Sequence, residues 1–235
     1  MNYKQNIQLP AAGLALAISL FISAAHAQNL VTNPSFEFGA FVDRGDGYQI
    51  LPNGSTAITG WTVINDQLAW GVFPNSAPAV SPITPFDGRF FLDLQGDGLF
   101  NPPYGGVMQA VATVVGQVYH FTMNLGTQQD ATSPFTHGPV SVQASAGSIS
   151  SVFTFDPSAT SGTQWGEFGF DFTATSTSTN LSIIGTNTAG GAFIGLDLVS
   201  LTAVRPSAVP ENGSSIFLLA LGLAGVVAVR RPALS

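Results

Sequence analysis

Cysteine is absent from this chain of 235 residues, and charged residues make up only 8% of it. Without cysteine there is no disulfide, no thiol nucleophile and no cysteine-ligated zinc or iron–sulfur centre. Lysine occurs once, at Lys4, and histidine three times, which leaves little material for histidine-based catalysis. Residues 28–205 carry twelve carboxylates and three arginines, a formal charge of −9. Because phosphate backbones are bound by clustered lysine and arginine, we expect no nucleic-acid partner.

The motifs of common hydrolases and nucleotide-binding enzymes are also missing. The sequence contains no Gly-x-Ser-x-Gly elbow, no His-Glu-x-x-His pair and no glycine-rich phosphate loop. His120 falls on the polar face of a predicted strand and His137 in a predicted turn, with no nucleophile predicted beside either. Glycosidase carboxylates can be distant in sequence, so a glycan-acting enzyme stays open as the lesser alternative. The sequence favours a protein that is not an enzyme.

The first 27 residues have the pattern of a signal peptide. Lys4 precedes an apolar run over residues 14–22, and Ala25-His26-Ala27 supplies the small residues that a signal peptidase recognises. Serines interrupt the run, which is shorter than the roughly 20 apolar residues of a membrane anchor. We therefore expect export, with cleavage before Gln28.

The last 30 residues, 206–235, combine a polar motif, an apolar run over 216–229 and the pair Arg230-Arg231. Positive charge after an apolar run holds that end in the cytoplasm, and the run is short for a permanent span of about 20 residues. We therefore expect transient membrane insertion followed by proteolysis, with a plain membrane tail as the alternative. The polar motif consists of Val209, Pro210, Glu211, Asn212, Gly213, Ser214 and Ser215.

This arrangement resembles the PEP-CTERM sorting signal, in the variant form Val-Pro-Asp-x-Gly-Ser-Thr. Glu211 stands for Asp and Ser215 for Thr, both conservative departures. The resemblance implies that an exosortase in the inner membrane cuts at the motif, in bacteria that make extracellular polysaccharide and biofilm matrix. It places the mature protein at the cell surface or in the extracellular matrix.

Between these ends, short segments alternate apolar and polar residues and are separated by turn signals. This period of two, without a helical stripe, predicts an all-β domain over residues 28–205. Nine or ten strands suit a two-sheet jelly-roll sandwich, with many of the 18 phenylalanines in its core. Four prolines over 74–85 predict a loop across one end. The expected strands are 58–64, 68–73, 90–94, 107–114, 117–125, 140–144, 149–155, 168–172, 180–183 and 193–203.

Seven short motifs follow one another through the body in a characteristic order: residues 29–37, 60–63, 70, 88–94, 105–109, 115–119 and 195–201. As a set they resemble the galactose-binding-like sandwiches found as carbohydrate-binding modules. They are more closely similar to exported bacterial "choice-of-anchor" domains related to a plant cell-wall protein family. The resemblance covers residues 29–204 and departs from the usual closing motif at Leu198, where Asn is usual. It implies that Glu37 and Asp197 help hold one buried calcium ion between the first and last strands.

Two carboxylates and several backbone carbonyls suit Ca²⁺, which takes six to eight oxygen ligands. The alternative is that Glu37 and Asp197 cap turns or accept backbone hydrogen bonds where the strands meet. Two further acidic stretches, 43–47 and 93–98, put pairs of acids beside glycines. They lack the spacing of an EF-hand loop, and we interpret them as solvated Asp-Gly turns.

A sugar site needs an aromatic ring beside amide or carboxylate groups, because a pyranose has an apolar face and a rim of hydroxyls. Trp61 and Trp70 lie in strand patterns and are expected in the core. Tyr104 and Trp165 lie among prolines and glycines, which predicts loops, and they are the expected platforms. The sequence predicts an exported protein that binds extracellular polysaccharide, with a ligand-free matrix or adhesion protein as the alternative.

Overall fold

The computed structural model describes residues 28–76, 82–96, 102–130, 138–157, 161–188 and 193–204. The expected signal peptide, the motif at 209–215 and the apolar run after it lie outside the described residues. Within the part that is described, no helix is both long and apolar enough to cross a bilayer.

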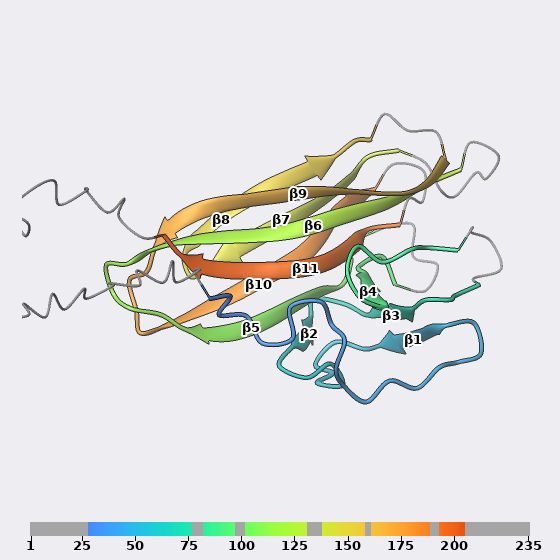
Figure 1. The fold of residues 1–235 in the computed structure, drawn as a ribbon, viewed down its shortest axis with the longest axis horizontal. Helices are drawn as coiled ribbons and strands as arrows, with labels where there is room; N and C mark the ends of the chain where they lie inside the picture. The colour runs from blue at the N-terminus through green and yellow to red at the C-terminus, as the bar shows by residue number, and fades with distance from the viewer. Residues whose placement is uncertain are drawn as a thin grey trace, which may run out of the picture.

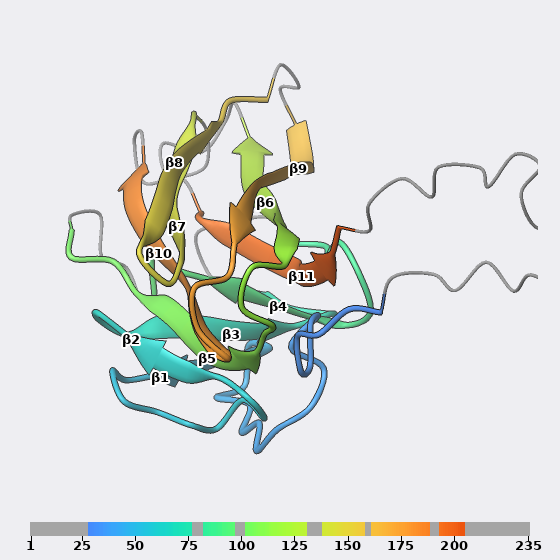
Figure 2. The ribbon, with the colours of Figure 1, turned by 90° about the vertical axis from the view of Figure 1, so that its left-hand side faces the viewer.

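The described residues form two antiparallel sheets packed face to face (Figures 1 and 2). One sheet has six strands in the order β1-β3-β4-β11-β6-β9, and the other has five in the order β2-β5-β10-β7-β8. This confirms the all-β jelly-roll sandwich. The strands are β1 (Tyr48–Leu51), β2 (Thr62–Ile64), β3 (Leu68–Val72), β4 (Phe90–Asp93), β5 (Gly106–Ala112), β6 (Val118–Asp130), β7 (Val140–Ala146), β8 (Ile149–Phe155), β9 (Ser161–Thr173), β10 (Ser178–Thr188) and β11 (Gly195–Ala203).

The main core lies between the sheets and follows the period-two pattern. On β6, the side chains of Phe121, Met123 and Leu125 are fully buried, as their alternation predicts. Trp61 and Trp70 belong to the same core and are 2% and 0% exposed, so their assignment to the core is confirmed. Each indole N–H donates to a backbone carbonyl of the opening segment, which satisfies the polar atom of a buried ring.

A second, smaller apolar layer covers the outer face of the six-stranded sheet. It contains Tyr48, Ala69, Ile83, Phe91 and Phe193, with Ile50 and Trp165 packed against it. Ile83 comes from the proline-rich segment and is bound through its backbone N–H and C=O to the Asn75 side chain. The same amide accepts from the Tyr48 hydroxyl. The described parts of this segment contain no strand, in agreement with the expected loop.

The opening segment lies against the last strand. The Leu30 N–H donates to the Leu201 carbonyl, and the Val199 N–H donates to the Pro34 carbonyl, at 2.8 and 2.9 Å. The Asn29 side chain bonds to the backbone of the same strand at both residues 199 and 201. The two ends of the domain are therefore joined by backbone hydrogen bonds, and the described chain begins and ends on the same side of the sandwich (Figure 1).

Three expectations about the strands are wrong. The segment 58–64 forms only β2, and Ile58 makes an isolated bridge with Gly39. Gly60, at φ 83°, breaks the extended chain between them. β1 was not expected, because the burial of its four residues does not alternate. β9 begins at Ser161, in a stretch expected to be a loop, because its glycines hide the alternation that pairing with β6 completes.

Candidate functional site

Glu37 and Asp197 both bind the stretch of backbone at residues 86–90. Glu37 Oε1 accepts hydrogen bonds from the backbone N–H groups of Arg89 and Phe90, at 2.8 and 2.7 Å. Asp197 Oδ2 accepts from those of Phe86 and Asp87, at 2.9 and 3.0 Å. The acid of the opening segment and the acid of β11 therefore meet through a shared loop, which the sequence did not reveal.

This loop is closely fitted to the carboxylates. Gly88 has φ 64°, and a β carbon there would lie 2.4 Å from Glu37 Oε1, so only glycine fits. The Ser35 hydroxyl donates to Asp87 Oδ2 at 2.6 Å, which adds a further link from the opening segment to the same loop. The segment 34–37, the loop and β11 thus form one hydrogen-bonded unit.

Asp197 is fully buried. Burial raises the pKa of its carboxyl to about 7, and the hydrogen bonds from Asp87, Leu198 and Phe86 only partly oppose that rise. The neighbouring Asp87 carboxylate raises the pKa further. The carboxyl of Asp197 is therefore mostly protonated, and uncharged, below pH 7.

The groups that face the two carboxylates are backbone N–H donors. This fits the alternative in which Glu37 and Asp197 accept backbone hydrogen bonds. No group of three or more acidic or histidine side chains is close enough to hold a metal within the described residues. Ca²⁺ would require oxygen atoms in the places that these N–H groups take. The arrangement as it stands does not fit a calcium ion, so calcium binding at Glu37 and Asp197 stays a prediction that requires the loop 86–90 to move.

Trp165 lies on β9, on the outer face of the six-stranded sheet, and is half-buried. Its partner in register is Gly126 on β6. A β carbon on Gly126 would lie 2.5, 2.5 and 2.8 Å from three atoms of the indole, so the ring lies flat over this glycine. The indole N–H donates to the Thr84 carbonyl at 2.9 Å, and Phe86 and Phe193 contact the ring. The ring is thereby held in one orientation.

Polar groups surround this ring on the same face. The Thr163 hydroxyl donates to Gln128 Oε1 at 2.7 Å and accepts from the Thr84 N–H. On the other side, Glu167 is exposed and lies opposite Asn124 in register. An aromatic surface with a hydroxyl on one side and a carboxylate on the other is an arrangement that suits a pyranose.

Tyr104 is buried, and its assignment as a platform is wrong. The side chain is 2% exposed and belongs to the main core. Backbone hydrogen bonds from Gly105 to Leu94 and from Gly185 to Gly105 hold this segment against the sheets. Proline and glycine neighbours predicted a loop correctly, but they carry no information about which side of a loop packs inward.

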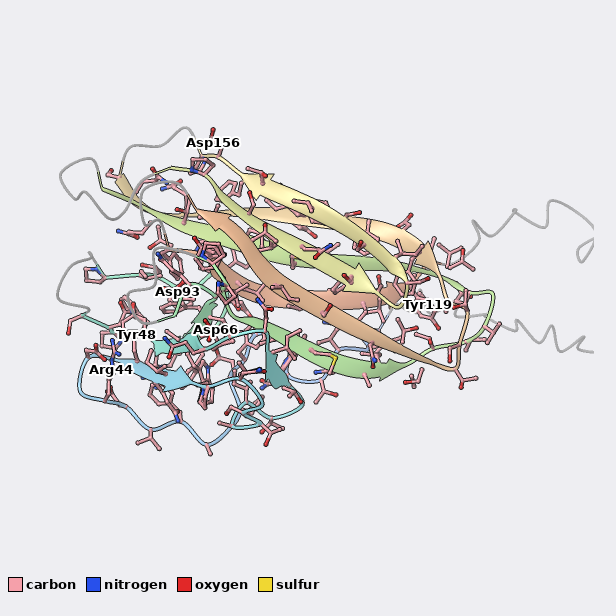
Figure 3. The ribbon with its side chains drawn as sticks, turned by 180° about the vertical axis from the view of Figure 1, so that it is seen from behind. Arg44, Tyr48, Asp66, Asp93, Tyr119 and Asp156 are labelled. Carbon is pink, nitrogen blue, oxygen red and sulfur yellow. The ribbon has the colours of Figure 1, made fainter. Side chains whose placement is uncertain are left out.

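The two acidic stretches differ. Asp43 caps an exposed turn, and hydrogen bonds from the N–H groups of Gly45 and Gly47 lower the pKa of its carboxyl, as a solvated Asp-Gly turn predicts. Asp93 instead ends β4, near Tyr48 and away from Tyr119 (Figure 3). Its Oδ1 accepts from Gln95 and Ile194, and burial raises the pKa of its carboxyl to about 7. The solvated-turn interpretation is wrong for Asp93.

His120 and Asp171 lie at the far end of the same outer face, paired across β6 and β9 with 2.5 Å between Nδ1 and Oδ1. Both side chains are more than half exposed, which is not the sheltered setting of an acid–base catalyst. Beside them, a pocket of about 370 Å³ opens between the β7–β8 turn and the end of β9. It is separated from Trp165 by six residues of extended strand, about 20 Å, and it does not belong to the Trp165 site.

No protein-family model matches this chain, and no curated protein matches it. Solved structures with a similar fold include carbohydrate-binding modules. The CBM22-1 xylan-binding domain of Paenibacillus barcinonensis Xyn10C is 14% identical, with 71% of this chain and 100% of that chain covered and a TM-score of 0.37. A family 35 module from Clostridium thermocellum is 9% identical, with coverage of 66% and 99% and a TM-score of 0.39. TmCBM61, solved with β-1,4-galactotriose, is 13% identical, with coverage of 76% and 100% and a TM-score of 0.36.

Proposed function

We propose that the outer face around Trp165 binds an extracellular polysaccharide without catalysis. The observation that supports this proposal is that the indole of Trp165 packs with one face on Gly126, while its N–H is hydrogen-bonded to the Thr84 carbonyl. One face of the ring is covered by the sheet, so a sugar can stack on the other. A ring fixed before binding loses little conformational entropy when a ligand arrives.

The neighbouring polar groups define what such a ligand would present. Glu167 accepts hydrogen bonds from hydroxyls on one side of the ring, and Thr163 Oγ1, whose proton is donated to Gln128, offers an acceptor on the other. An acidic domain repels anionic chains, so the ligand class is a neutral glycan.

Binding to a panel of neutral polysaccharides, followed by calorimetry with the glycan that binds, tests the proposal. Trp165→Ala is expected to weaken binding by roughly 1–3 kcal/mol, the range for loss of a well-packed aromatic contact. Phe38→Ala is the matched control, because Phe38 is an exposed aromatic ring outside this face. Equal affinity of Trp165→Ala and the parent protein would refute the site.

Two other outcomes of the same assays favour the alternatives. Failure to bind any neutral glycan would favour a ligand-free matrix or adhesion protein. Release of reducing ends from the bound glycan would favour a glycan-acting enzyme.

We also propose that the chain is exported and sorted: signal peptidase cuts before Gln28, and an exosortase cuts within residues 209–215. The supporting observations are the two apolar runs, the small-residue triplet and the Arg pair. Intact-mass analysis of the protein recovered from the producing cells tests both cuts. A mature chain that keeps Arg230 and Arg231 would favour a permanent membrane tail instead.

A further inference from the structure

The two sheets have four edge strands, and three of them are protected against pairing with another chain. β1 and β2 have four and three residues, too short to recruit a partner strand. β9 is long, but Gly162, Gly166 and Gly169 weaken it, and Glu167 and Asp171 place charge along it. These are the devices by which sheet proteins prevent edge-to-edge association.

The fourth edge, β8, has none of these devices. Its seven residues, Ile149–Phe155, include no charge, no proline and no glycine, and most are β-branched or aromatic. β8 pairs with β7 on one side, and no described strand is hydrogen-bonded along its other side (Figure 2). β9 of the facing sheet packs against the inner side chains of β8. Val152 is 63% exposed and Ile149 46% exposed, so apolar side chains accompany the open backbone edge.

From Ser150 to Phe155, the side chains of β8 alternate between two faces. Ser151, Phe153 and Phe155 are half-buried toward the core, whereas Ser150, Val152 and Thr154 are exposed on the outer face. The fold therefore fixes which face a second strand would have to match.

We propose that β8 is a self-association edge, which pairs antiparallel with β8 of a second copy of this chain. A two-fold register centred on Val152 places Val152 against its own counterpart and Ser150 against Thr154. The outer face of the joined strands then carries a β-branched pair flanked by two hydroxyl pairs, which are favourable cross-strand combinations. The inner face keeps its phenylalanines over the existing core.

Charge favours this surface and this direction of pairing. Residues 28–205 carry a formal charge of −9, which opposes contact between two copies over most of the surface, whereas β8 itself carries no charge to oppose it. Asp156 follows β8 directly (Figure 3). In the antiparallel register it faces Ser148, whereas parallel pairing would bring the two Asp156 carboxylates side by side. The resulting ten-stranded sheet continues across the two-fold axis.

Sedimentation velocity of the full chain over a concentration series tests the proposal. The parent protein is expected to form a dimer as its concentration rises. Val152→Lys is expected to weaken association at least about tenfold, because it buries a positive charge in the new pair and adds like charge at the axis. The control is Val114→Lys, since Val114 is also 66% exposed but lies in the turn after β5. Equal effects of the two lysines, or a parent protein that stays monomeric, would overturn the proposal.

Disulfide trapping tests the register directly, because the chain contains no cysteine of its own. Residues that face each other in antiparallel strands have Cα atoms about 4.5–5.5 Å apart, within the range of a disulfide. Val152→Cys is expected to form a covalent dimer under mild oxidation much faster than Val114→Cys. Similar rates for the two variants would show that the copies meet by random collision and would overturn the β8 pairing.

Discussion

At the scale of single residues, the position of Trp165 depends on a residue with no side chain. A ring lies flat on a sheet only where the strand below offers space, and Gly126 offers it. The same device recurs where the rings of Phe91 and Phe193 lie over Gly71 and Gly195. A β carbon added to any of these glycines would lie less than 3 Å from atoms of the ring above it.

Gly126→Ala is therefore expected to lift the indole from its seat and weaken glycan binding by roughly 1–3 kcal/mol, as loss of the aromatic contact would. It also costs stability, about 1–3 kcal/mol for overpacking. Calorimetry and denaturant unfolding measure the two effects. Gly71→Ala makes a similar clash under Phe91 and serves as the control, with a similar loss of stability and no loss of binding. Unchanged glycan affinity in Gly126→Ala would contradict the proposed seat.

Asp197 makes the stability of the domain depend on pH. The pKa of its carboxyl is about 7 in the folded state, against an ordinary 3.8. The folded state thus holds this proton more tightly than the unfolded state, so its contribution to stability is present below pH 4 and is lost as pH rises toward 7. The contribution amounts to as much as about 4 kcal/mol.

Denaturant unfolding at several pH values between 4 and 7 tests this in metal-free buffer. The slope is expected to flatten in Asp197→Asn, whose amide does not titrate, while Asp156→Asn, at an exposed position, keeps the slope of the parent. An unchanged slope in Asp197→Asn would show that the carboxyl titrates outside this range.

At the scale of one element, β11 contains a strained position. The register with β6 shifts between Asp197 and Ser200, and Leu198 within this irregularity has φ 41°. Leucine adopts the left-handed region at a cost of roughly 1–2 kcal/mol, whereas asparagine tolerates it. Asparagine at position 198 would therefore fit this backbone geometry better than leucine does.

Leu198→Asn is expected to raise the free energy of unfolding by about 0.5–1 kcal/mol over that of Leu198→Ala, by relief of backbone strain. Alanine is the appropriate reference because it removes the leucine side chain and keeps the unfavourable φ. Denaturant unfolding compares the two variants. Asparagine no more stable than alanine would mean that the leucine position is not strained.

At the scale of the whole molecule, the unit formed by residues 34–37, the loop 86–90 and β11 ties the beginning of the domain to its end. Calcium requires the loop 86–90 to withdraw its N–H groups from Glu37 and Asp197; an ion bound there would stabilise the native state by mass action, by about 2.7 kcal/mol at a hundred times its dissociation constant. Thermal melts with added Ca²⁺ and with chelator are then expected to differ by several degrees, and the difference is expected to vanish in Glu37→Gln. Identical melts would leave the two carboxylates as backbone acceptors only.

The sequence by itself determined the fold class and most strands, because side-chain alternation is a local property of the chain. The expected segments 68–73, 90–94, 107–114 and 149–155 correspond closely to β3, β4, β5 and β8. Trp61 and Trp70 were likewise assigned to the core from the strand patterns around them. Such patterns predict which residues are buried, because one face of each strand has to be covered.

Only the tertiary structure decided the site, because the site depends on contacts between residues far apart in the chain. Trp165 has its seat because register brings it opposite Gly126, and Tyr104 is buried because Gly105 bonds to both Leu94 and Gly185. Glu37 and Asp197 meet only through the backbone at residues 86–90. Glycine and proline in the sequence mark where a chain can turn, but the pairing of distant strands decides which side of that turn faces water.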